Sequence, residues 1–184
     1  MDESVHQISR VRNSGAKASR GRNLIFLDAD TTVPTSTFCK ALQALDSGEV
    51  GCGGATLCFD DHYGRWFSGR LLPYLWNFIS VRFKLFAGSF IFCTSELFFN
   101  CGGFPESHFA GEEIVLSRKL KRETRKKRKR VLILTDEPVV SSARKLTWHS
   151  DWSIFTMILP LVLFPFFLKN HKACKFWYSR PSKD

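Results

Sequence analysis

The chain has 184 residues, a length that fits a single domain large enough to bury a core of its own. Its formal charge is +10, but residues 118–130 hold ten Lys and Arg against one acid. That leaves about +1 for the rest and argues against a generally basic, nucleic-acid-binding surface. The six cysteines include no C-x-x-C pair and no zinc spacing, so we expect free thiols in a reducing, cytoplasmic compartment.

The first 22 residues are polar and basic without an apolar core, so we expect no signal peptide and assign no element there. The short apolar run at 24–27 is typical of a strand buried on both faces, as in a parallel sheet. Apolar residues spaced three and four apart then predict a helix over 35–45, and a Gly-rich turn leads into a strand over 48–59. The buried face of that helix is expected to carry Phe38, Ala41, Leu42 and Leu45.

The second half continues the alternation of helical and strand patterns. Residues 65–86 are aromatic and amphipathic with interleaved basic residues, which predicts a helix, and 88–94 predicts a buried strand. Residues 96–103 indicate a helix or turn ending at a Gly-Gly pair, 112–127 a helix that opens with two acids, and 131–134 a short strand. This order favours an α/β layer architecture.

The C-terminal part is dominated by the uncharged segment 152–168. It is somewhat shorter than the roughly 20 residues that usually span a bilayer, and Pro160 and Pro165 would kink a helix. A transmembrane helix, an interfacial helix and a buried core helix all remain open, with membrane contact favoured. We therefore divide the chain into a domain at 1–150 and a hydrophobic, membrane-associated segment at 151–184.

Two carboxylates, Asp28 and Asp30, follow the strand at 24–27 directly. Acids at the carboxyl end of such a strand can hold a divalent cation that in turn binds a diphosphate. Two other interpretations stay open on this motif alone: a polar cap at the strand end, and a phosphoryl-accepting Asp28 as in haloacid-dehalogenase-like phosphatases. The phosphatase interpretation would use Asp136 and Glu137 as its later acidic pair.

A second motif distinguishes these interpretations. Gly102-Gly103-Phe104 is followed by Glu112-Glu113 and then by Leu116-Ser117, and this order resembles the family 2 glycosyltransferases of the GT-A fold. The resemblance implies a Rossmann-like mixed sheet flanked by helices, here with a hydrophobic C-terminal helix. It also implies that Glu113 is the catalytic base, with Glu112 beside it, although Asp is commoner at the position of Glu113.

The resemblance also implies a reaction and its ligands. Asp28 and Asp30 would bind Mn²⁺ or Mg²⁺ and the diphosphate of a nucleotide-diphosphate sugar, with Asp30 the direct metal ligand. The sugar would pass with inversion to an acceptor hydroxyl that the sequence does not identify. Lys17, in the stretch 13–21 that resembles the segment before the Asp-x-Asp strand, would contact the nucleotide sugar or its diphosphate. Arg144, in the Pro138–Lys145 string, would contact the diphosphate or the acceptor, and a solvated basic pair remains open for Arg144 and Lys145.

The resemblance leaves a gap before Asp28. A complete domain of this kind opens with a strand, a helix and a strand that hold the nucleotide base, so we expect the N-terminal half of the fold to be incomplete here. An alternative from another class is an inactive relative that binds a membrane or nucleic acid through the basic run at 125–130. A solvated loop is the favoured interpretation of that run, and nucleic acid is not an expected partner.

Overall fold

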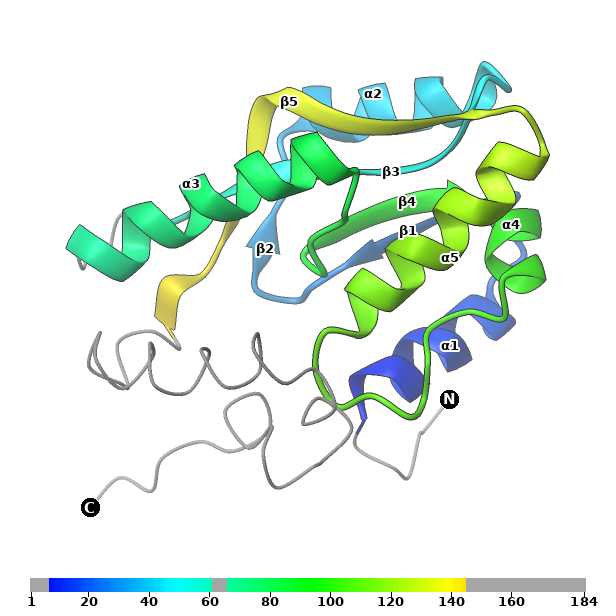
Figure 1. The fold of residues 1–184 in the computed structure, drawn as a ribbon, viewed down its shortest axis with the longest axis horizontal. Coiled ribbons are helices and arrows are strands. Elements are labelled where there is room, and N and C mark those ends of the chain that lie inside the picture. Colours follow the sequence, from blue (N-terminus) through cyan, green and yellow to red (C-terminus); the bar gives the residue numbers. More distant parts are fainter. Residues whose placement is uncertain (1–6, 61–65, 145–184) are drawn as a thin grey trace.

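The computed structural model describes residues 7–60 and 66–144. In chain order the elements are α1 (Ile8–Ala18), β1 (Asn23–Leu27), β2 (Thr31–Thr32), α2 (Thr35–Asp46), β3 (Val50–Phe59), α3 (Trp66–Phe83), β4 (Phe90–Thr94), α4 (Ser95–Asn100), α5 (Glu112–Lys126) and β5 (Arg130–Ser141). The strands form one sheet with helices packed against it, as Figure 1 shows. The predicted α/β architecture with a mixed sheet flanked by helices is confirmed.

The sheet has the strand order β1-β4-β3-β5-β2. Only β3 and β5 pair in parallel, while the other three pairings are antiparallel. The prediction that the strand at 24–27 is buried on both faces of a parallel sheet is therefore wrong. Within the described chain, β1 pairs only with β4, and its residue Leu27 is exposed. An apolar run by itself does not distinguish an edge strand from a central one.

Two apolar layers lie on opposite faces of this sheet. One joins α1, α4 and α5 to the sheet around Phe26, Phe98 and Phe104, whose rings lie 5.0–5.9 Å apart. The other joins α2 to the sheet around Ala41 and Leu45. The helix predicted over 35–45 is confirmed, but Phe38 is exposed, and its neighbour Thr37 is buried instead.

Helix α1 was not predicted, because its inward face is polar. Ser9 and Asn13 are buried together with Ala16, whereas the apolar Val11 faces solvent. A pattern search for apolar residues at helical spacing therefore finds no helix in this segment. Its burial rests on polar contacts with a distant loop, described below.

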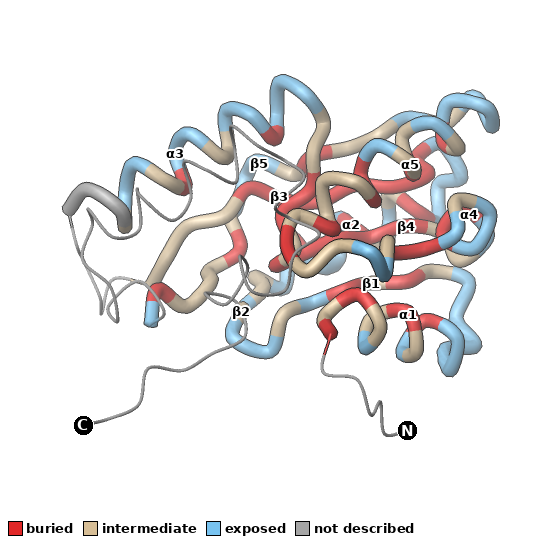
Figure 2. The backbone as a smooth tube through the Cα atoms, turned by 60° about the horizontal axis from the view of Figure 1, so that its bottom comes forward, coloured by how far each residue is buried: buried red, intermediate tan, exposed pale blue. Residues whose placement is uncertain are grey.

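Helix α3 has a similarly polar inward side. The side-chain amide of Asn77 donates to the Leu57 carbonyl (2.8 Å) and accepts from the Leu57 N–H (2.9 Å), which ties the helix to β3. The helix predicted over 65–86 is confirmed, yet much of its apolar surface faces outward. Figure 2 shows exposed residues along its outer side.

The remaining predicted elements are present, with changed ends. β5 runs to Ser141, well beyond the strand predicted at 131–134, and the two-residue strand β2 was not predicted. No helix in the described part of the chain is long and apolar enough to cross a membrane. The segment 152–168, and with it the expected C-terminal helix, lies outside the described residues, as do Lys145 and the tail 151–184.

Candidate functional site

The candidate site lies at the end of the sheet where β1, β3 and β5 have their carboxyl ends. The Asp28 N–H donates to the Ser89 carbonyl (3.3 Å), which fixes the turn after β1 to the start of β4. The Ser142 N–H donates to the Asp30 carbonyl (3.0 Å), which fixes the other end of the turn to the end of β5. The Asp28–Asp30 turn is therefore held from both sides by strands that come much later in the chain.

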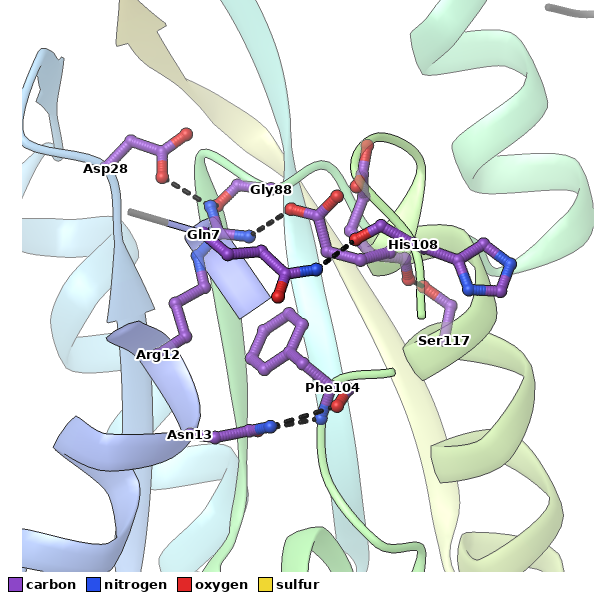
Figure 3. Close-up of polar contacts among 10 residues, drawn as sticks. Gln7, Arg12, Asn13, Asp28, Gly88, Phe104, His108 and Ser117 are labelled. Carbon is purple, nitrogen blue, oxygen red and sulfur yellow. Dashed lines mark hydrogen bonds and ion pairs between the residues drawn. The ribbon is translucent and has the colours of Figure 1, made fainter. Parts of the chain in front are cut away.

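Arg12 joins two of the predicted site residues, as Figure 3 shows for Arg12 and Asp28. Its guanidinium contacts Asp28 Oδ1 at 2.5 Å and Glu112 Oε1 at 3.0 Å, and also donates to the Gly88 carbonyl (3.2 Å). The side chains of Arg12 and Glu112 are only 13% and 6% exposed, whereas that of Asp28 is 40% exposed, so the Glu112 side of this network is shielded from water and the Asp28 side is open to it. The structure thus brings one strand-end acid, Asp28, and one acid of α5, Glu112, onto the same guanidinium, which forms a constellation of three charged residues.

Helix α1 also holds the loop that leads to α5. The Asn13 side chain donates to the Phe104 carbonyl (3.0 Å) and accepts from the Phe104 N–H (2.9 Å), as Figure 3 shows. Gln7 donates to the carbonyls of Glu106 (2.7 Å) and His108 (3.0 Å). These contacts position the segment that delivers Glu112 to Arg12.

The glycine pair of that loop is required by its geometry. Gly103 has φ +64°, and a Cβ there would lie 2.7 Å from Asn13 Oδ1. A side chain at this position would therefore meet both backbone strain and the amide that holds Phe104. The Gly-Gly-Phe motif is thus part of the contact with α1.

Sequence reasoning missed Gln7, Arg12 and Asn13. Gln7 and Arg12 precede the stretch 13–21, and Asn13 is its first residue. No pattern in the sequence links these three residues to their partners roughly a hundred positions later. The available signal was modest: Asn13 opens the segment that resembles the family, and Arg12 directly precedes it. It indicated a site nearby without assigning a partner to either side chain.

Glu112 and Glu113 open α5 after Gly111, which has a left-handed backbone (φ 67°). Burial, and then the charge of the adjacent Glu112, raise the pKa of Glu113 to about 8. Arg12 acts in the opposite direction on the same pKa, but more weakly. Burial is thus the larger cause, and the neighbouring carboxylate adds to it.

The other predicted residues lie at different distances from this constellation. Asp30 is exposed at the tip of the turn, and the Arg144 N–H donates to Ser142 Oγ (3.3 Å), close to the residue that fixes Asp30. Lys17 is exposed in the last turn of α1. Among the described contacts none joins Lys17 to Asp28 or Glu112. The residue of α1 that contacts these two carboxylates is Arg12.

The donor atoms at the turn suit a hard divalent cation bound together with a ligand. No group of three or more His, Cys, Asp and Glu side chains in the described parts of the chain forms a ready metal cage. Mg²⁺ and similar ions, however, are commonly held by one or two carboxylates plus phosphate oxygens. Asp28 and Asp30 can supply those carboxylates, and the buried hydroxyl of Ser89 beside them has no hydrogen-bond partner.

The phosphatase interpretation loses one of its supports, and part of the basic run is paired with acids. Asp136 and Glu137, the later acidic pair of the phosphatase interpretation, contact Lys40 (2.6 Å) and Ser36 (2.5 Å) of α2, away from Asp28. In the basic run, three cations pair with acids: Lys126 with Glu123 (2.8 Å), Lys127 with Glu96 (2.6 Å) and Arg130 with Glu49 (2.5 Å). This pairing is typical of a solvated surface.

Comparison with known proteins gives a family and a fold. The family model described as glycosyl transferase family 2 matches residues 3–104, which include the Asp28–Asp30 turn and the Gly-Gly-Phe motif. No curated protein matches the sequence significantly. Two solved structures are similar in fold, each with 15% sequence identity and a TM-score of 0.53. The first, S. aureus TarS 1–349, matches over 85% of this chain and 44% of its own length. The second, S. aureus TarS, matches over 88% of this chain and 31% of its own length. The chain thus spans less than half the length of either neighbour.

Proposed function

The chain belongs to glycosyl transferase family 2, and from this membership we propose that it transfers a sugar from a nucleotide-diphosphate sugar to an acceptor hydroxyl. The observation that carries the proposal is the double ion pair of Arg12, which links a strand-end carboxylate to the acidic pair of α5. The Asp28 side of this link suits a leaving diphosphate, and the side of the α5 acids suits an incoming acceptor hydroxyl.

On the donor side, Asp28 and Asp30 present carboxylate oxygens at the end of β1. Mn²⁺ or Mg²⁺ bound there would stabilise the charge of the leaving diphosphate. Arg12 holds the Asp28 carboxylate in place through the 2.5 Å contact, and Asp30 stays exposed as the direct ligand. Arg144, near the other end of the turn, is the proposed cation for the diphosphate, with Lys17 of α1 a more distant contact.

On the acceptor side, Glu113 is the proposed base and Glu112 its neighbour. The Glu112 carboxylate is engaged by Arg12 at 3.0 Å, so its charge is already compensated. Glu113 has a pKa raised to about 8, close to working pH, which suits a group that takes a proton from a hydroxyl and later releases it. A base on the acceptor and a diphosphate leaving from the opposite side correspond to a single displacement, and hence to inversion.

The proposed location is the cytoplasm, with membrane association through 152–168. The described cysteines form no disulfide, which fits a reducing compartment. Burial raises the pKa of Cys52 to about 12, so that thiol is protonated at neutral pH and unsuited to metal binding.

Calorimetry with nucleoside diphosphates tests the donor side directly. We expect the chain to bind one of UDP, GDP, CDP or dTDP in the presence of Mn²⁺, and much more weakly with EDTA. Asp30→Asn is expected to weaken this binding at least about tenfold, because a carboxylate ligand is lost. Asp136→Asn is the matched control, since Asp136 lies on the α2 side of the sheet. Metal-independent binding, or an Asp30→Asn variant that binds like the control, contradicts the proposal.

A further inference from the structure

The outward side of α3 carries a continuous apolar stripe. Tyr74 is 71% and Phe78 65% exposed, and both lie on the solvent side of the helix. The other exposed apolar residues of this helix are Leu71, Leu75, Ile79, Val81 and Phe83. Single exposed apolar residues are common, but a set this dense on one helix marks an interaction surface.

The rotation of α3 about its axis is fixed by polar contacts on its inner side. Asn77 makes two hydrogen bonds with the backbone of Leu57, and Ser80, which is fully buried, donates to the Leu85 carbonyl (2.6 Å). Turning the apolar stripe inward would break these bonds and bury polar groups without partners. The outward orientation of the stripe is therefore built into the packing of the helix.

A strongly basic surface adjoins this stripe. Five cations of α5 line a shallow hollow of about 520 Å³: Arg118, Lys121, Arg122, Arg125 and Lys126. The two surfaces meet where the Lys121 ammonium donates to the Phe83 carbonyl at the end of α3. Burial, followed by the charges of Arg125 and Arg118, lowers the pKa of Lys121, so these cations are close enough to repel one another.

One acid of α5 compensates one of these five cations. Glu123, on the same helix, pairs with Lys126 at 2.8 Å. On the α3 side the stripe is flanked by two further exposed cations, Arg70 and Arg82. The Arg82 guanidinium lies over the Phe83 ring, 5.5 Å from its centroid. The combined face is therefore aromatic and apolar on one side and cationic on the other.

We propose that this α3–α5 face, the exposed apolar residues of α3 together with the five cations of α5, docks the protein on an anionic lipid bilayer. Aromatic side chains at the headgroup level and cations against lipid phosphates are the two contributions that hold a protein at such an interface. A second copy of the chain is a poorer occupant, because it would place like charges together if it covered the same face. RNA would use the cations but has no need of an aliphatic and aromatic stripe.

Co-sedimentation of the full chain with vesicles tests the proposal. The vesicles are phosphatidylcholine alone, or phosphatidylcholine mixed with phosphatidylglycerol. Tyr74→Ser/Phe78→Ser is expected to weaken binding to mixed vesicles by about tenfold or more, because two inserted rings are lost. Arg122→Gln/Arg125→Gln is expected to weaken binding to mixed vesicles by about 30-fold and to flatten its salt dependence, with little change on phosphatidylcholine alone.

Controls and contrary outcomes follow from the fold. Phe38→Ser/Lys40→Gln removes an exposed aromatic and a cation from α2, across the sheet, and is expected to bind like the unchanged chain. Equal binding of all variants would assign lipid contact to another part of the chain and overturn the proposal. It is also overturned if the α3 variant abolishes a dimer that forms without lipid, or if the α5 variant alone loses tight RNA binding. Neither result bears on diphosphate binding at Asp30.

Discussion

At Arg12 a single guanidinium compensates two carboxylates from distant parts of the chain. Glu112 is almost fully buried, so without Arg12 its charge would remain desolvated and unpaired. Breaking a buried ion pair by removing one partner costs far more than the pair itself contributes. Arg12 is therefore as important for the stability of the site as for its chemistry.

We expect Arg12→Gln to lower the free energy of unfolding by about 3 kcal/mol, measured by urea denaturation. The double variant Arg12→Gln/Glu112→Gln should recover part of the loss, because the buried charge is removed with its partner. Arg10→Gln is the control: Arg10 pairs with Glu106 at 3.5 Å on the surface, and its loss should cost less than about 1 kcal/mol. Equal losses for the Arg12 and Arg10 variants would contradict this assignment.

Glu113 gives the site a pH dependence in both rate and stability. The transfer rate should rise with pH through about 8, as the proposed base loses its proton, and Glu113→Gln should lower kcat about a hundredfold or more and abolish the rise. The folded pKa lies above the ordinary value of 4.5, so the folded state binds more protons between the two values. The contribution of Glu113 to unfolding free energy therefore falls as pH rises from about 4.5 to 8.

Thermal melts of the Glu113→Gln variant and the unchanged chain measure the stability effect. The variant should gain stability relative to the unchanged chain over that pH window, because it has no charge to bury. Glu49→Gln serves as the control, since Glu49 lies on the surface with Arg130 and should show no such trend. A variant whose relative stability does not change with pH would show that Glu113 titrates normally.

At the scale of elements, α1 and α3 are attached to the rest of the fold by amides on their inner sides. Asn13 holds the backbone of Phe104, and Asn77 holds that of Leu57. Apolar periodicity therefore located α2 and α5 well, failed to find α1, and found α3 while leaving open which side faces the sheet. The contacts of these asparagines depend on tertiary structure, which local patterns in a sequence do not contain.

Asn13→Ala tests the attachment of α1 to the loop. It leaves the N–H and the carbonyl of Phe104 without their partner in a buried position, and we expect a loss of about 2 kcal/mol in unfolding free energy. Val11→Ala, on the exposed side of the same helix, should change the stability by less than about 0.5 kcal/mol. A loss no greater than that of the control would show that α1 is not held through Phe104.

At the scale of the whole molecule, the sequence predicted the class of the fold and the two acidic motifs, but not how they meet. Asp28 and Glu112 were assigned from separate motifs, and the residue that joins them, Arg12, belongs to the unpredicted helix. The strand at 24–27 was found, yet its place at the edge of the described sheet was not, because strand neighbours depend on topology. The sequence motifs therefore identified the candidate acids, whereas their contacts through Arg12 depend on the tertiary structure.

The two ion pairs of Arg12 also differ in the length of the chain loop between the two paired residues. The pair with Asp28 spans 16 positions, whereas the pair with Glu112 spans 100. In a flexible chain, the larger loop costs about 1.6 kcal/mol more conformational entropy to close. The contact of Arg12 with Glu112 therefore depends on long-range folding, whereas its contact with Asp28 closes only a short loop.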